Sequence, residues 1–145
     1  MTVVLLVVGI LVLVGGILAA VLIPTLRRMQ RGSDAFTETF LAQAAASGET
    51  ILGGPEAANY RGGTGSHSTV KGNGTLVLTD RRLVFRKLSG GEVEIPRAAI
   101  TGIREEASFL GSRVGGQTCL VVDTTEPAEV GFFVTDLARW RTLLA

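Results

Sequence analysis

The first part of the chain is an uninterrupted apolar segment, and charged residues occur only after it. Residues Met1 to Ile23 carry no charged side chain and are mostly Val, Leu and Ile. A helix rises about 1.5 Å per residue, so a run of this length crosses the roughly 30 Å hydrocarbon core of a bilayer. The pattern therefore predicts a transmembrane anchor over residues 1–26, followed by a single polar domain.

A cleaved signal peptide is the alternative interpretation of this segment. Signal peptides combine a basic start with a shorter apolar stretch and a small-residue cleavage site after it. Here no Lys or Arg precedes the apolar run, and the pair Ala19 and Ala20 lies inside the run rather than after it. We therefore favour a retained anchor.

Three arginines, Arg27, Arg28 and Arg31, follow the apolar segment. Positive residues beside a span remain on the cytoplasmic side, which predicts a single-pass protein of the cell inner membrane. Its amino terminus would lie outside, and its polar domain would lie in the cytoplasm. The same arginines are candidate contacts to anionic headgroups, although topology alone also accounts for them.

Small residues in the anchor are spaced at i and i+4, as Gly15 with Ala19 and Gly16 with Ala20. This spacing lets a second helix approach closely, so it predicts a homo-oligomer through these positions. Gly and Ala are also frequent in membrane helices in general.

A juxtamembrane segment over residues 27–49 contains a predicted short linker helix. Ser33 or Asp34 is placed to cap its start, and Gly48 follows its last turn. Phe36 and Phe40 share one face of this helix. That face lies either on the bilayer surface or against the domain, and we favour the domain because the helix is short.

Beyond Gly53, Gly54 and Pro55, which are expected to break the chain, the pattern changes to short strands and turns. In the hairpin predicted from Thr75–Thr79 and Arg82–Leu88, Leu83 and Phe85 point to one face and Val84 to the other. The glycine-rich residues 62–74 predict a flexible loop. The predicted strands are Ala57–Arg61, Thr75–Thr79, Arg82–Leu88, Glu92–Ile95, Thr101–Ala107, Thr118–Asp123 and Val130–Thr135.

The last predicted element is a helix that Thr135 or Asp136 caps, with Trp140 on its apolar face. About seven strands and one amphipathic helix predict a mainly β domain over residues 50–145. It would be a small sandwich or a partly open barrel plugged by the helix. Trp140 would be the largest side chain of that plug.

Several segments carry a resemblance to a known family. They are Gly74–Phe85 (GTLVLTDRRLVF), Glu94–Pro96, Ile100–Ile103 and Trp140 in a terminal helix. Over Thr50–Ala145 the chain resembles bacterial pleckstrin-homology-like (PH-like) and GRAM-like domains. The resemblance implies a seven-stranded partly open barrel with a C-terminal capping helix, which binds lipid headgroups or proteins and performs no chemistry. Phosphoinositide-binding members carry a cluster of Lys and Arg across the first hairpin. This hairpin would hold only Arg61 and Lys71, so that activity is not carried over.

Composition and motifs argue against several functions. The formal net charge is +1, which predicts no general attraction to nucleic acid. Cys119 is the only cysteine, so no intramolecular disulfide forms, and its apolar surroundings predict burial. His67 is the only histidine and lies in the glycine-rich loop, so we expect no metal site and no cofactor. Glu105 and Glu106 are adjacent and would point to opposite faces of a strand, which excludes a catalytic carboxylate pair.

The sequence therefore predicts a non-enzymatic PH-like domain at the cytoplasmic membrane surface, acting as an adaptor for a protein partner in a membrane assembly. Its contact surface would be an unpaired strand edge or the loops around the basic residues. The alternative is a lipid-headgroup module, in which Lys71, Arg82 and Arg86 contact anionic phospholipid. Residues 61–87 are mainly basic and residues 92–136 mainly acidic, which suits an oriented domain, although an ordinary solvated surface accounts for this distribution equally well.

Overall fold

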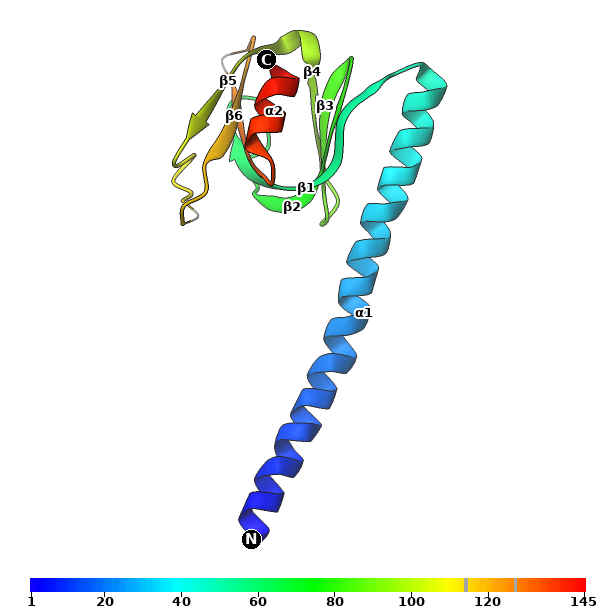
Figure 1. Ribbon diagram of the computed structural model, residues 1–145, viewed down its shortest axis with the longest axis vertical. Coiled ribbons are helices and arrows are strands. Elements are labelled where there is room, and N and C mark those ends of the chain that lie inside the picture. Colours follow the sequence, from blue (N-terminus) through cyan, green and yellow to red (C-terminus); the bar gives the residue numbers. More distant parts are fainter. Residues whose placement is uncertain (114, 127) are drawn as a thin grey trace. The chain divides into compact units, whose positions relative to one another are not determined.

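The computed structural model describes residues 1–113, 115–126 and 128–145, which form two compact units, residues 1–35 and 36–145. The elements, shown in Figure 1, are α1 (Thr2–Ser47), β1 (Ile51–Gly63), β2 (Gly72–Thr79), β3 (Arg82–Lys87), β4 (Glu92–Pro96), η1 (Arg97–Ala99), β5 (Ile100–Glu106), β6 (Cys119–Thr124), β7 (Glu129–Val134) and α2 (Leu137–Leu144). The strands and α2 all belong to the second unit.

α1 is one helix of 46 residues, and its N-terminal part is long and apolar enough to cross a membrane. The prediction of a separate linker helix that begins at Ser33 or Asp34 is therefore wrong. Between Pro24 and Gly48 the only residue that disfavours a helix strongly is Gly32. A lone glycine costs about 1 kcal/mol, which does not interrupt the hydrogen bonds of a long helix. Gly48, with φ of 75°, ends the helix as predicted.

The seven strands form one antiparallel sheet in the order β4-β3-β2-β1-β7-β6-β5. The sheet curls into a half-barrel, and α2 lies on its concave side (Figure 1). This confirms the predicted mainly β architecture with a C-terminal capping helix. Asp136 caps α2 as predicted, because its Oδ1 accepts a hydrogen bond from Arg139 N at 3.0 Å. β4 and β5 are the two edges of the sheet.

Aromatic rings fill the concave side of the half-barrel. Tyr60, Phe85 and Phe132 have no exposed surface, and their ring centroids lie 5.4–5.6 Å apart. Trp140 of α2 is also fully buried, and its Nε1 donates to Glu56 Oε2 at 2.9 Å. Trp140 thus closes the core, which confirms its predicted role as the plug of the barrel.

β1 differs from the prediction because it is longer. The residues expected to break the chain, Gly53 to Pro55, lie inside β1 at two register shifts in its pairing with β2. Such shifts interrupt the ladder locally and accommodate Gly and Pro. A Cβ at Gly53 would lie 2.5 Å from Leu143 Cδ1, so the glycine lets α2 approach the strand. β1 and β2 also extend into the predicted flexible loop, and only residues 64–71 connect them.

The convex side of β2 and β3 is covered by the end of α1. Phe40 and Ala44 are 4% and 1% exposed, and they form one buried cluster with Val77 and Val84. This confirms that the Phe36–Phe40 face packs on the domain, and that Val84 points away from the concave core. A second cluster on the convex side consists of Phe109, Cys119, Val121 and Phe133.

Candidate functional site

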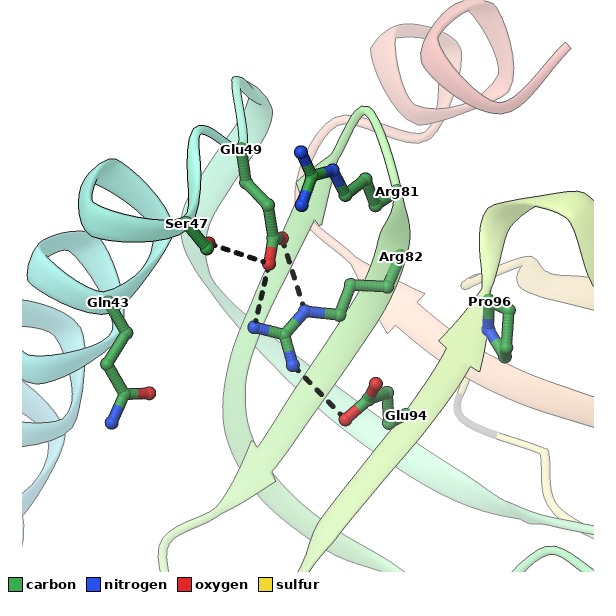
Figure 2. Close-up of a pocket in the computed structure, with 7 residues that line it drawn as sticks. All are labelled: Gln43, Ser47, Glu49, Arg81, Arg82, Glu94 and Pro96. Carbon is green, nitrogen blue, oxygen red and sulfur yellow. Dashed lines mark hydrogen bonds and ion pairs between the residues drawn. The ribbon is translucent and has the colours of Figure 1, made fainter.

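A pocket of about 440 Å³ lies where the last turns of α1 meet the β2–β3 turn and the end of β4. Figure 2 shows the side chains that line it, which are Gln43, Ser47, Glu49, Arg81, Arg82, Glu94 and Pro96. All of them belong to the unit of residues 36–145. Six of the seven lining residues are polar or charged, and the Arg82 side chain lies among them.

Arg82 lies between two glutamates in this pocket. Its Nε and Nη2 each donate to Glu49 at 3.2 Å, which makes a bidentate contact, and its Nη1 donates to Glu94 at 3.2 Å. The Arg82 guanidinium also lies 5.2 Å from the ring centroid of Phe40. The side chain of Glu49 is only 7% exposed, and this ion pair joins the short segment between α1 and β1 to β3.

The charges of this pair are mutually stabilised. Burial raises the pKa of the Glu49 carboxyl, but hydrogen bonds from Arg82 and Thr79 outweigh burial and leave that pKa below its ordinary value. Burial likewise lowers the pKa of Arg82, and the hydrogen bonds and charges of Glu49 and Glu94 raise it above its ordinary value. Both groups are therefore ionised at neutral pH.

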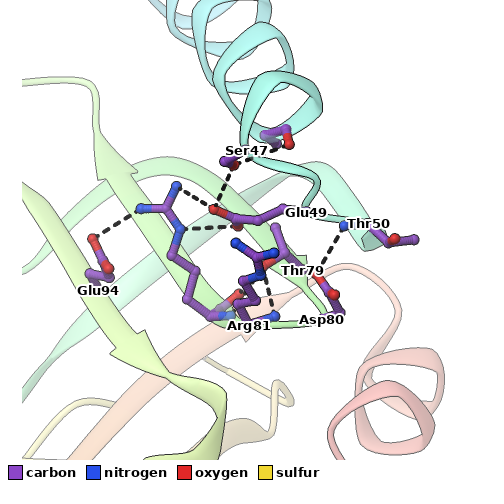
Figure 3. A network of polar contacts seen from close by, with 9 residues as sticks. Ser47, Glu49, Thr50, Thr79, Asp80, Arg81 and Glu94 are labelled. Atoms are coloured by element: carbon purple, nitrogen blue, oxygen red, sulfur yellow. Dashed lines mark hydrogen bonds and ion pairs between the residues drawn. The ribbon is translucent and has the colours of Figure 1, made fainter.

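The β2–β3 turn is organised by Thr79 and Asp80 (Figure 3). Thr79 Oγ1 accepts hydrogen bonds from Arg81 N at 3.1 Å and from Arg82 N at 3.0 Å. Asp80 Oδ1 accepts from Thr50 N at 2.9 Å, which ties the turn to the start of β1. Asp80 thus serves the turn, as its sequence context predicts. The guanidinium of Arg81 forms no ion pair with any described residue.

The predicted lipid-contact residues lie in different surroundings. Arg86 is on β3 with Arg82; it lies 3.8 Å from a Glu92 oxygen and 5.1 Å from the ring centroid of Phe36. Lys71 instead donates a hydrogen bond to Ser112 in the β5–β6 connection. The positive charge of β3 is therefore largely neutralised, because glutamates contact both Arg82 and Arg86.

The anchor arginines, Arg27, Arg28 and Arg31, belong to the other compact unit and are exposed. They form no ion pair with any residue that the structure describes.

A second charged cluster surrounds Arg104 on the convex side of β5, β6 and β7. Arg104 Nη2 lies 2.7 Å from Glu129 and its Nε lies 3.0 Å from Glu106, while Nη1 contacts Asp123. These hydrogen bonds raise the pKa of Arg104, first through Glu129 and Asp123. Three carboxylates share one guanidinium, so this surface is negatively charged, in agreement with the predicted acidic part of the domain.

The residues most able to perform chemistry are separated. Cys119 is buried as predicted, and burial raises the pKa of its thiol to about 11, which keeps the thiol protonated. Among the described residues, no three His, Cys, Asp or Glu side chains are grouped as metal ligands. The arginines of β3 and β5 described above form ion pairs with carboxylates, and the apolar side chains pack in the clusters of the sheet.

The chain matches neither a model of a known protein family nor a curated protein. Its function must therefore be inferred from the fold and from the residues at its surface. The Glu49–Arg82 pair was not predicted, because its partners are 33 residues apart and no local pattern relates them. The Arg104 cluster was missed for the same reason, since its members come from three strands.

Proposed function

We propose that this protein is a non-enzymatic adaptor, which holds a PH-like domain at the cytoplasmic surface of the cell inner membrane and there binds a protein partner. One observation carries the proposal: a half-barrel, whose two edge strands pair with no further strand among the described residues, continues from a helix that is apolar enough to cross a membrane. The edges offer backbone groups to a partner. The helix would confine this binding to the membrane surface.

The PH-like assignment is supported by the order and packing of the elements. Seven antiparallel strands curl around an aromatic core, and a C-terminal helix fills the concave side through Trp140. This arrangement is the one implied by the resemblance in Gly74–Phe85. The proposed topology is supported by Arg27, Arg28 and Arg31, whose charges follow the apolar segment directly.

Crosslinking in intact cells tests the adaptor function. Cells that express the full chain are treated with a membrane-permeant crosslinker, and the chain is purified under mild detergent. A variant without residues 1–26 is the control. We expect a reproducible protein partner that the full chain captures more efficiently than the control does. Recovery of no reproducible partner contradicts an adaptor role.

Accessibility of introduced cysteines tests the topology. In the Cys119→Ala background, single cysteines at position 2 and at Ser89 are treated with a membrane-impermeant maleimide before and after the cells are opened. We expect position 2 to react in intact cells and position 89 to react only after opening. Reaction of position 89 in intact cells would contradict a cytoplasmic domain.

A lipid-binding function is the second candidate, and the free charges of the anchor arginines favour it. Arg82 and Arg86 contact glutamates, whereas Arg27, Arg28 and Arg31 are exposed and unpaired among the described residues. Flotation of residues 27–145 with vesicles separates the two candidates, because this fragment keeps the three arginines and lacks the apolar segment. Binding that requires anionic lipid and fades with salt supports headgroup recognition. No flotation favours the adaptor.

A further inference from the structure

The half-barrel leaves two strand edges, and their chemistry differs. β4 and β5 end the sheet, and within the described residues neither pairs with a further strand. An unpaired edge presents N–H and C=O groups that another chain can use. The length, alternation and side chains of each edge decide which of them can accept a partner.

The β4 edge is poorly suited to pairing. The hydrogen bond from Arg97 N to Arg81 O, at 2.8 Å, determines which residues of β4 direct their backbone groups toward β3. Only Glu92 and Glu94 then direct an N–H outward, because alternate residues of a strand bond to opposite sides. Pro96, at the end of the strand, has no N–H to offer. Short length, charge and proline are the features by which edges resist pairing.

The β5 edge is longer and contains no proline. Along β5, successive residues direct their backbone N–H and C=O groups alternately toward β6 and away from it. The hydrogen bond from Thr125 N to Ala99 O, at 2.8 Å, and the register shift that follows it determine which residues face β6. This alternation directs the N–H and C=O groups of Ile103 and Glu105 outward. Ile103 is half-buried and packs against the main core, so the concave side of this edge offers one apolar contact.

The two sides of the β5 edge differ in charge. On the convex side, Glu106, Asp123 and Glu129 surround Arg104, and their side chains are 44%, 31% and 39% exposed. Glu106 belongs to β5 itself, whereas Asp123 lies on β6 and Glu129 on β7. Arg61 lies over Phe133 on the same side. The negative charge nearest the edge is therefore that of Glu106. On the concave side, Glu105 is neutralised by Arg141 of α2 at 2.9 Å. A strand added here would meet Ile103 and the neutralised Glu105–Arg141 pair on the concave side, and the carboxylate of Glu106 on the convex side.

We propose that the β5 edge binds an extended segment of the partner protein, in which apolar residues alternate with Lys or Arg. The segment would add to the sheet as a further strand. Its apolar residues would lie beside Ile103, and its basic residues would lie beside Glu106, because side chains of a strand alternate between the two faces. This inference rests on the proposed adaptor function and specifies its contact surface.

Peptide binding to the full chain in phosphatidylcholine nanodiscs tests this inference. One labelled probe alternates Val and Lys, a second alternates Val and Glu, and a third is the Val–Lys peptide N-methylated at alternate residues. We expect saturable binding of the Val–Lys peptide and about tenfold weaker binding of the Val–Glu peptide, since opposite charges on neighbouring strands attract. The N-methylated peptide lacks the required donors and should not bind. Equal binding of the Val–Lys and Val–Glu peptides would overturn the proposed specificity.

Two variants at one position separate the edge from its side chain. Glu105→Pro removes an outward N–H and also the Arg141 ion pair, whereas Glu105→Ala removes only the ion pair. We expect Glu105→Pro to bind the Val–Lys peptide about fivefold to tenfold more weakly than Glu105→Ala does, because a backbone hydrogen bond is lost. Circular dichroism establishes that both variants are folded. Equal affinities of the two folded variants would overturn the proposal.

The same variants distinguish this proposal from the adaptor function. If a cellular partner crosslinks to Glu105→Pro as well as to Glu105→Ala, the adaptor stands and the β5 edge is not its contact. If the chain binds the Val–Lys peptide but captures no cellular partner, the adaptor function fails.

Discussion

Replacement of Phe40 by Ala tests whether the end of α1 is a structural part of the domain. The Phe40 ring is 4% exposed and lies in a cluster with Val77 and Val84 on the convex side of the sheet. Its ring also lies under the Arg82 guanidinium, 5.2 Å away. Truncation would therefore remove both an apolar contact and a cation–π contact.

The expected cost follows from these two contacts. A buried Phe→Ala substitution costs about 3–5 kcal/mol, which includes the cavity that it leaves. The cluster lies at the surface of the sheet, where neighbours relax more easily, so we expect about 3 kcal/mol. For a unit of about this size, each kcal/mol lowers the melting temperature by about 4–8 °C. The variant should therefore melt roughly 12–24 °C below the wild type.

Thermal unfolding of residues 36–145, followed by circular dichroism, measures this loss. Leu41→Ala is the matched control, because Leu41 is the next residue of the same helix and is 37% exposed. Surface substitutions usually change stability by less than about 0.5 kcal/mol. A fragment that begins at residue 50, the domain start predicted from sequence, should be less stable than residues 36–145, since it exposes Val77 and Val84.

The reasoning would be refuted if Phe40→Ala and Leu41→Ala melted at the same temperature. It would also be refuted if residues 50–145 were as stable as residues 36–145. Either result would mean that the end of α1 contributes nothing to the domain.

Three further predictions concern other contacts. Glu49→Gln should destabilise residues 36–145 by about 1–3 kcal/mol at pH 7 in urea unfolding, because a hydrogen bond to a charged group is weakened. Because the pKa of Glu49 is lower in the folded state, its ionised carboxylate contributes fully to the free energy of unfolding above the ordinary pKa of 4.5. This contribution is lost as the pH falls through the folded-state pKa, so the stabilities of the variant and the wild type should converge at low pH. Trp140→Phe should cost about 1–3 kcal/mol in the same assay, because the Glu56 carboxylate loses its indole donor, and an unchanged stability would contradict that contact. Gly131→Ala should cost about 1–3 kcal/mol, because its Cβ would lie 2.4 Å from Phe109 Cδ1. Gly115→Ala should be close to neutral, because no atom of the described residues beyond its chain neighbours lies within 4 Å of its Cβ position.

Local patterns predicted the elements whose side chains alternate in a regular way. Leu83 and Phe85 are apolar at every second position, and the structure places both in the main core with Val84 on the other side. Asp136 and Trp140 likewise marked the start and the buried face of α2. These predictions succeeded because burial on one face imposes a period of two on strands and of 3.6 on helices.

Elements that depend on distant partners were predicted less well. β1 continues through Gly53 to Pro55 because β2 and α2 hold it there, and neither contact is visible in a local window. The continuity of α1 was missed because a capping residue such as Ser33 looks the same inside a helix as at its start. The helix propensity of a single residue is a small free energy compared with the packing and hydrogen bonding of a whole helix.

The sequence alone determined that an apolar segment precedes a mainly β domain, since hydrophobic periodicity is a local property of the chain. Only the tertiary structure decided that Glu49 pairs with Arg82, that three carboxylates surround Arg104, and that β4 and β5 are the edges of the sheet. Those features arise where the curled sheet brings distant residues together, and their energies depend on distance and burial in three dimensions rather than on spacing along the chain.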